Sequence, residues 1–293
     1  MIEATTQSER PATSARMPLS PADVVRVARP GLIVSHIWAY LLPILHGSYV
    51  ESWNFWVGLV YVTVPLGLLI YGWNDYFDGD VDRLCPRKSD PGMSAVFGLR
   101  LPPEKRAMLP QYVLAAQLPF ALIWAVAGQP WLVGWLVLMA AGNALYNGPG
   151  LRLSRVPVLA ELTATGIYLL IVWLGMLVHS PAMPAWCWLF AALSILDLQI
   201  MGTLVDREQD AAVGKRTFSV AFGRTTSLAT VFVFLLIKTA LTWRYTGDPL
   251  ATAVMGLGAV LVATGFSIGR YRRTSTTYST FIVLDWIWLG LML

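Results

Sequence analysis

Four aspartates and one asparagine at the end of an apolar segment are the residues best suited to do chemistry. Residues 72–82 read Gly-Trp-Asn-Asp-Tyr-Phe-Asp-Gly-Asp-Val-Asp. On a continuous helix Asn74, Asp78 and Asp82 lie at i, i+4 and i+8, with Asp75 beside them, and form one stripe about 12 Å long. Their like charges repel, so a cation must offset them. Oxygen-only ligands suit a hard ion, and the stripe therefore predicts a Mg²⁺ site.

A second acidic cluster follows a later apolar segment. Asp206 and Asp210 share one helix face at i, i+4, and Gly-Lys-Arg-Thr follows at 214–217. If the two clusters face each other across a cavity, their carboxylates would hold metal ions that bridge a diphosphate, and nearby Lys and Arg would bind its remaining oxygens. The flanking pairs Arg87-Lys88 and Lys215-Arg216 are candidates for that role.

Such a site would activate a diphosphate leaving group. Mg²⁺ and basic groups would stabilise the charge on the departing diphosphate, and an aromatic pocket would accommodate the allylic cation through cation–π contacts. The sequence has 13 Trp and 11 Tyr to supply such walls. The candidate pocket residues, including one acid inside an apolar segment, are Tyr71, Trp73, Tyr146, Tyr168, Trp173 and Asp197.

Composition identifies the elements that must position these residues as membrane helices. The 293 residues are 56% hydrophobic and 13% charged, with a mean hydropathy of +0.58, which excludes an ordinary soluble domain. Nine apolar stretches are long enough to cross a bilayer. They predict an all-α, nine-transmembrane-helix bundle with spans near 31–49, 53–76, 108–127, 129–147, 156–178, 183–205, 226–243, 250–269 and 278–293.

Basic residues set the expected orientation. All of the 21 Lys and Arg except Lys238 and Arg244 fall in the N-terminal arm or in alternate loops on one side. Since such residues stay cytoplasmic, we expect a cytoplasmic N-terminus and active site in a multi-pass membrane protein. The net charge of +4 is therefore a topology signal and gives no reason to expect nucleic acid as a partner.

The chain reads as one catalytic domain preceded by an arm. Residues 1–22 predict a disordered cytoplasmic arm, and 23–293 a single transmembrane domain. Acidic clusters end the second and sixth spans, and basic exits follow the fourth and eighth. This spacing suggests two four-helix halves plus a ninth helix, with the site where the halves meet.

Taken together, these features resemble the UbiA superfamily of intramembrane prenyltransferases. The resemblance rests on the N-D-x-x-D-x-x-x-D pattern from Asn74 to Asp82, the D-x-x-x-D pair, the following G-K-R-T and the nine spans. It implies that Asn74 and the motif aspartates bind Mg²⁺ and a prenyl diphosphate. It also implies that Lys215 and Arg152 contact phosphate.

The expected reaction is transfer of a prenyl group to a lipophilic, most plausibly aromatic, acceptor within the bilayer. Two alternatives stay open. A terpene cyclase of the same superfamily would ionise the same diphosphate and cyclise it without an acceptor. A cation transporter would bind ions at the acidic stripes, although transporter sites usually lie near the midplane on broken helices.

Overall fold

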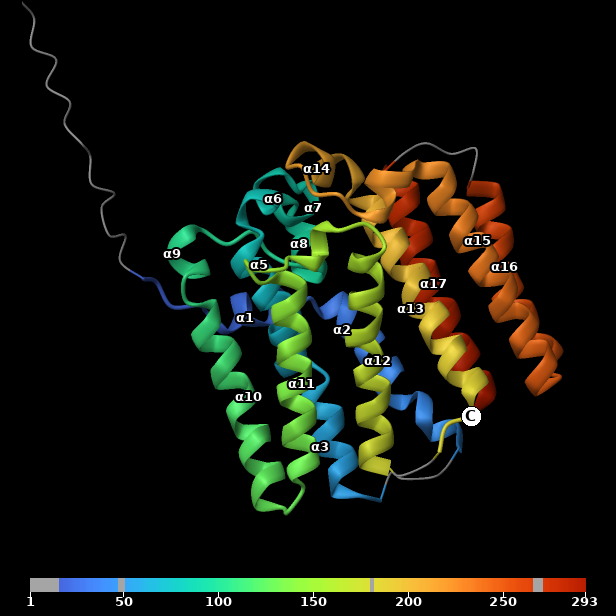
Figure 1. Ribbon diagram of the computed structural model, residues 1–293, viewed down its shortest axis with the longest axis horizontal. Coiled ribbons are helices and arrows are strands. Elements are labelled where there is room, and N and C mark those ends of the chain that lie inside the picture. The colour runs from blue at the N-terminus through green and yellow to red at the C-terminus, as the bar shows by residue number, and fades with distance from the viewer. Residues whose placement is uncertain (1–15, 47–50, 180–181, 266–270) are drawn as a thin grey trace, which may run out of the picture.

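A computed structural model of the chain describes residues 16–46, 51–179, 182–265 and 271–293. Within these ranges all regular structure is helical (Figure 1). Most elements are α-helices, η1 and η3 are 3-10 helices, and η2 is a π-helix. In chain order they are α1 (Pro21–Val27), α2 (Pro30–Leu41), η1 (Leu42–His46), α3 (Trp53–Tyr61), α4 (Val64–Gly67), η2 (Leu68–Gly72), α5 (Trp73–Phe77), α6 (Gly79–Leu84), α7 (Pro86–Ser89), α8 (Pro91–Phe97), α9 (Pro103–Arg106), α10 (Leu109–Val126), α11 (Pro130–Asn147), η3 (Leu153–Arg155), α12 (Leu159–His179), α13 (Ala185–Val205), α14 (Arg207–Ala212), α15 (Phe218–Thr246), α16 (Pro249–Gly265) and α17 (Tyr271–Met292).

Local sequence signals explain where several of these helices begin. Proline at the first helical position opens α1, α2, α8 and α11, where the missing N–H has no helical partner to lose. Ser20 and Asp23 form a capping box at the start of α1. Ser20 and Leu19 lie within the range expected to be a disordered arm. The N–H of Leu19 donates to Tyr112 Oη. Residues 1–15 of that range lie outside the described residues.

By length and apolar character the described residues offer fewer candidate membrane spans than the nine expected. Helices occupy all nine expected ranges within the described residues. Five of them are long and apolar enough to cross a bilayer, and the bent pair formed by Pro21–Val27 and Pro30–Leu45, which meet at 58°, makes a sixth. The apolar helices at Pro249–Thr264 and Tyr278–Met292 are shorter. The chain is thus an all-helical protein with five or six candidate spans.

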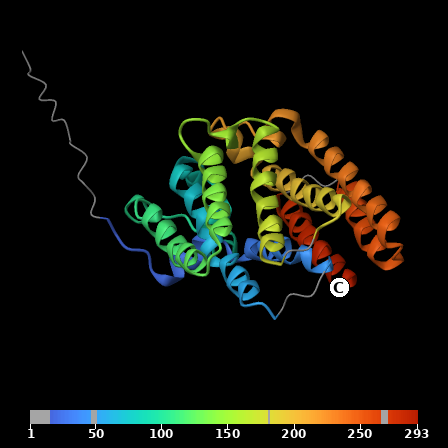
Figure 2. The ribbon, with the colours of Figure 1, turned by 60° about the horizontal axis from the view of Figure 1, so that its bottom comes forward.

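The helices pack in two groups that meet along α12, α13, α2 and α17 (Figures 1 and 2). One group contains α2, α3, α10, α11 and α12, and the other contains α13, α15, α16 and α17. The fifth expected span, α12, therefore packs with the first group, so contacts do not follow the expected division into four and four. The short helices α6 and α14, far apart in sequence, lie side by side at one end of the bundle.

Both acidic motifs lie at helix breaks, which changes the expected stripe. The first was expected on one continuous helix, but α5 ends and α6 begins at Asp78, whose φ and ψ are −98° and 25°. Asp206 separates α13 from α14 with a similar φ of −93° and ψ of 7°. This sparsely populated region of backbone space is frequent at active sites. The two motifs thus share a local geometry that the sequence spacing alone does not reveal.

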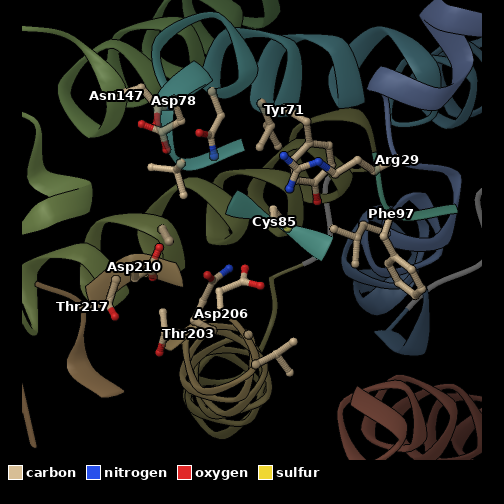
Figure 3. A pocket seen from close by; sticks show the side chains of 18 of the residues that line it. Arg29, Tyr71, Asp78, Cys85, Phe97, Asn147, Thr203, Asp206, Asp210 and Thr217 are labelled. Carbon is tan, nitrogen blue, oxygen red and sulfur yellow. The ribbon is translucent and has the colours of Figure 1, made fainter. Parts of the chain in front are cut away.

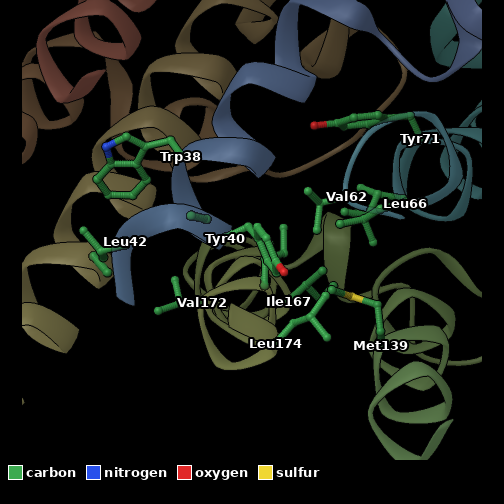
Figure 4. Packing of buried hydrophobic residues seen from close by; sticks show 14 of the residues in the cluster. Trp38, Tyr40, Leu42, Val62, Leu66, Tyr71, Met139, Ile167, Val172 and Leu174 are labelled. Atoms are coloured by element: carbon green, nitrogen blue, oxygen red, sulfur yellow. The ribbon is translucent and has the colours of Figure 1, made fainter. Parts of the chain in front are cut away.

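Close backbone approaches hold the first group together around Tyr40, which is fully buried. Figure 4 shows Tyr40 among Val172, Leu174 and Ile167 of α12. A Cβ on Gly175 would lie 2.4 Å from the Tyr40 carbonyl oxygen, and one on Gly58 would lie 2.3 Å from the Tyr40 hydroxyl. Only glycine permits these approaches, and they bring α12 against α2 and α3 beneath the acidic end.

Candidate active site

The two acidic motifs open into the same cavity, whose volume is about 180 Å³. Figure 3 shows Asp78 and Asn147 on one side of this space and Asp206 and Asp210 on the other. The cavity lies between the two helix groups, and α5, α6, α11, α12, α13 and α14 all contribute to its wall. The helix breaks at the two motifs aim their side chains inward.

The structure brings five of the six expected metal-binding residues to this cavity. Its wall includes Asn74, Asp78, Asp82, Asp206 and Asp210. Asp82 is buried, which raises the pKa of its carboxyl, and the ammonium of Lys88 offsets only part of that increase. A cation at the cavity would favour the ionised form of such a group.

Lys215 is the basic group that joins the two motifs. Its Nζ lies 3.7 Å from Asp78 Oδ2 and 3.6 Å from Asp210 Oδ1. Burial acts to lower the pKa of Lys215, but the carboxylates of Asp210 and Asp78 outweigh it, so the pKa is raised above its usual value. A positive charge therefore stands where the two acidic motifs converge, within reach of an anion in the cavity.

Asp75, the sixth expected metal ligand, is not part of the cavity wall and lies in a buried ion-pair network. Its Oδ1 accepts from Arg29 Nη2 at 2.7 Å and from Lys88 Nζ at 2.6 Å. Lys88 also donates to Asp82 Oδ1 at 2.7 Å and lines the cavity. Asp75 thus holds two basic side chains at the cavity edge, and Lys88 links it to the metal-site candidate Asp82.

Three of the five expected diphosphate-binding residues are not placed in the cavity wall. Arg152, in a left-handed conformation with φ 44°, and the exposed Arg216 lie outside it. Arg87 belongs to α7, but its side chain lies outside the described part of the structure. Lys215 and Lys88 are the two basic candidates that line the cavity.

Of the aromatic residues expected to form the pocket, three line the cavity and two do not. Tyr71, Tyr146 and Tyr168 line the cavity. Trp73 packs instead against Tyr76 and Phe77, and Trp173 is 39% exposed on the outside of α12.

Asp197 forms part of a separate buried charge cluster. Lys238 Nζ donates to Asp197 Oδ2 at 3.0 Å and to Asp285 Oδ1 at 2.8 Å. These three residues join α13, α15 and α17 inside the second helix group. Its neighbour Leu198 lines the cavity, but Asp197 is fully buried and does not.

Other cavity residues were given no role by the sequence analysis. Arg29 lies over the Tyr71 ring at 4.6 Å and reaches the cavity from the N-cap position before α2. Asn143 and Asn147 are buried in the wall, and among the described residues neither side-chain polar atom of Asn147 has a hydrogen-bond partner. The i, i+4 spacing of two asparagines at a helix end is the signal that could have identified them. Arg29 carries no such signal, because its role depends on helices distant in sequence.

The donor set fits a hard divalent cation bound together with an anionic substrate. It consists of carboxylate and amide oxygens. The buried Asn147 amide has no hydrogen-bond partner within the described part of the chain. Among the described residues, no three His, Cys, Asp or Glu side chains converge closely enough to hold a metal by themselves. Mg²⁺ usually takes only one or two carboxylates and completes its coordination with water and substrate phosphate.

Comparisons with known proteins find a matching family and several relatives. The sequence model of the UbiA prenyltransferase family matches residues 32–289. A lycopene elongase/hydratase of Corynebacterium glutamicum is 25% identical over 194 residues, which are 65% of this chain and 66%, just under two thirds, of that protein. A lycopene elongase/hydratase of Halobacterium salinarum is 28% identical over 78% of this chain and 82% of its own length. A 4-hydroxybenzoate octaprenyltransferase of Xanthomonas campestris is 29% identical over 38% of each chain.

A solved structure shares the fold. A UbiA homolog from Archaeoglobus fulgidus, solved bound to DMAPP and Mg²⁺, superimposes with a TM-score of 0.69 and 16% identity, covering 92% of this chain and 99% of that one. At this identity the likeness concerns the fold alone.

Proposed function

The chain belongs to the UbiA prenyltransferase family, and from this premise we propose that it transfers a prenyl group from a prenyl diphosphate to a lipophilic acceptor inside the membrane. One observation carries the proposal. Two acidic motifs from different helix groups open into one cavity, and Lys215 lies within 4 Å of an aspartate from each. A diphosphate with its metal ions is the ligand whose charges match both the carboxylates and the ammonium.

In this proposal the carboxylates bind the metal and the ammonium binds the diphosphate. Asp78, Asp82, Asp206 and Asp210 would hold Mg²⁺, with Asn74 as a further oxygen donor. The ion, when bound, neutralises the charge that develops on the diphosphate as its bond to carbon breaks. Lys215 would donate to the diphosphate oxygens.

The apolar part of the cavity would receive the prenyl chain and the acceptor. An apolar residue lines the wall about two helical turns before an aspartate of each motif. Ile70 precedes Asp78 by eight residues, and Leu198 precedes Asp206 by eight. Eight residues of helix span about 12 Å. The reacting carbon would therefore lie between the carboxylates and an apolar wall that contains Tyr71 and Tyr168.

An acyclic polyene is the acceptor that we favour over the aromatic ring expected from the sequence. The two elongase/hydratases named above carry lycopene in their names and match most of this chain, whereas the octaprenyltransferase matches 38% of it. The cavity, at about 180 Å³, is smaller than the 300–1,000 Å³ or so typical of ligand pockets. It would enclose the reacting ends of both substrates, while their apolar tails extend towards the bilayer.

The terpene cyclase shares the ionisation step and differs in what captures the cation. A cyclase would release a cyclic hydrocarbon or alcohol from the diphosphate alone, whereas a transferase requires the second substrate. Family membership favours either enzyme over a cation transporter. The basic residues of the loops further support a site that faces the cytoplasm.

The proposal is tested with the full chain in lipid nanodiscs, supplied with dimethylallyl diphosphate, lycopene and Mg²⁺, and followed by mass spectrometry. We expect a prenylated polyene, and no product in excess EDTA. Asp78→Asn and Asp206→Asn should each lower the rate by about 100-fold or more, because metal-assisted charge stabilisation contributes several kcal/mol. Asp90→Asn is the matched control, since Asp90 is exposed and caps α8 away from the cavity. Turnover that survives EDTA, or a cyclic product without lycopene, would overturn the transferase assignment.

A further inference from the structure

A hydrogen-bonded chain leads from the apolar part of the cavity to a fully buried histidine. Tyr168, which is partly exposed to the cavity, is hydrogen-bonded through its hydroxyl to the hydroxyl of Tyr71. The Tyr71 hydroxyl lies 3.1 Å from His36 Nε2, and His36 Nδ1 lies 3.2 Å from the carbonyl oxygen of Val62. His36 has no exposed surface. None of the roles assigned above uses this histidine.

The last partner in the chain fixes the direction of its hydrogen bonds. A carbonyl oxygen only accepts, so His36 Nδ1 carries the hydrogen and donates it to Val62. Both partners of His36 are neutral, so the ring rests as the neutral tautomer with a lone pair on Nε2. Tyr71 then donates its hydroxyl hydrogen to Nε2, and Tyr168 donates to Tyr71. The oxygen of Tyr168 keeps lone pairs that can accept a proton from the cavity.

The local backbone also indicates that Tyr71 is deliberately positioned. It lies on the π-helix η2, one turn before Asn74, and such π-turns inside helices are frequent at functional sites. Its ring stacks on His36 at 5.5 Å between centroids, and the Arg29 guanidinium lies over it at 4.6 Å. In Figure 4 the Tyr71 ring extends across the space beside Val62, with its hydroxyl at the far end from the helix that carries it.

Transfer to a polyene requires a group that takes up a proton. When an alkene acceptor attacks the prenyl carbon, the new C–C bond leaves a cation on the acceptor. That cation becomes a neutral product when an adjacent C–H bond breaks and its electron pair forms a C=C bond. The cation can instead capture water, and the oxonium so formed gives an alcohol when it loses a proton to further water. In the proposed reaction the carboxylates of the cavity would hold the metal ions of the diphosphate.

We propose that Tyr168, Tyr71 and His36 form a relay that removes this proton. The proton from the C–H bond passes to the Tyr168 oxygen, the Tyr168 hydroxyl proton passes to Tyr71, and the Tyr71 hydroxyl proton passes to His36 Nε2. Both phenols end neutral, and the imidazole carries the added positive charge. After the product leaves, the proton returns by the reverse route to Tyr168 and passes to water that enters the cavity, which restores the resting state. This relay rests on the proposed prenyl transfer and makes Tyr168 the catalytic residue, with Tyr71 and His36 acting through it.

The relay is tested by the partition between alkene and alcohol products in the nanodisc assay with lycopene and dimethylallyl diphosphate. The partition is measured in Tyr168→Phe, Tyr71→Phe and His36→Gln as the amount of each product per diphosphate released, so a change in the overall rate does not enter the comparison. Their ratio of alkene to alcohol should fall by about 100-fold, the lower end of what a positioned acid or base contributes. His36→Gln is the decisive variant, because glutamine can accept from Tyr71 and donate to Val62 but cannot take up the proton. Wild-type partition in all three variants would overturn the relay.

A matched control separates proton transfer from loss of a buried hydroxyl. Tyr61 is fully buried outside the cavity wall, and its hydroxyl donates to Gln117 Oε1 at 2.8 Å. Tyr61→Phe should leave the product ratio unchanged, and a shift equal to that of Tyr71→Phe would overturn the proposal. Elimination by the wild type should also slow in D₂O, and the relay variants should lose that isotope effect.

The tautomer can be measured without turnover. The chain has three histidines, so ¹⁵N-histidine NMR with His36→Gln for assignment identifies the ring signals of His36. We expect a neutral ring with hydrogen on Nδ1, and hydrogen on Nε2 would overturn the direction of the relay. If the wild type releases no diphosphate, or releases it independently of Asp206, the proposed function itself fails and the relay with it. Normal release with unchanged partition in the variants refutes the relay alone.

Discussion

Replacement of Lys238 by methionine should destabilise the fold without altering the chemistry of the cavity. Lys238 is 1% exposed, and its ammonium lies 3.0 Å from a carboxylate oxygen of Asp197 and 2.8 Å from one of Asp285. Methionine keeps most of the side-chain volume but leaves two buried carboxylates without their cation. Removing one partner of a buried ion pair costs about 3–5 kcal/mol. At about 2–4 °C per kcal/mol for chains of this size, the melting temperature should fall by roughly 6–20 °C.

The measurement is thermal unfolding in a fixed detergent, combined with diphosphate release per folded molecule. Adding Asp197→Asn and Asp285→Asn to Lys238→Met should recover much of the lost stability, because the uncompensated charges are then gone. Diphosphate release by the folded fraction of either variant should stay at the wild-type level. A melting temperature within 2 °C of wild type for Lys238→Met would refute the assignment of the cluster as a structural ion pair. Loss of diphosphate release in folded protein would instead place Asp197 at the reaction site.

Two further comparisons test the site and the packing. Lys215→Gln should lower kcat/KM for the prenyl diphosphate by about ten- to a hundredfold, since a charge-assisted donor contributes roughly 1.5–3 kcal/mol. Arg152 lies outside the cavity wall, so Arg152→Gln should change kcat/KM by less than about twofold. Equal effects of the two substitutions on kcat/KM would contradict the geometry. Gly175→Ala should lower the free energy of unfolding by about 1–3 kcal/mol, because its Cβ would meet the Tyr40 backbone at 2.4 Å. On the same helix a Cβ at Gly166 meets nothing within 4 Å, so Gly166→Ala should raise the free energy of unfolding by up to about 1 kcal/mol. Thermal unfolding of the two variants distinguishes these outcomes, and equal melting temperatures would refute the close approach.

The sequence alone was sufficient for the helical class, the approximate positions of the apolar helices and the family resemblance that the acidic motifs carry. These properties depend on local information: apolar runs long enough to cross a bilayer, and carboxylates separated by one or two helical turns. It also placed Lys215 beside the second motif, where the chain itself keeps the two within five residues. Asn74, Asp78, Asp82, Asp206 and Asp210 all line the cavity, and packing of the two helix groups brings the two motifs together there.

Tertiary structure decided which of the remaining polar groups reach the cavity. Asp75 and Asp78 are three residues apart, yet one pairs with Arg29 across 46 positions and the other faces the cavity. The partners of Asp75 are Arg29 and Lys88, and the packing that brings them to it is not visible in the spacing of the motif. His36 is the extreme case: its type and neighbours in sequence give no hint of a role, because its partners at positions 62 and 71 are brought to it only when α2 packs against the segment that leads into the first motif.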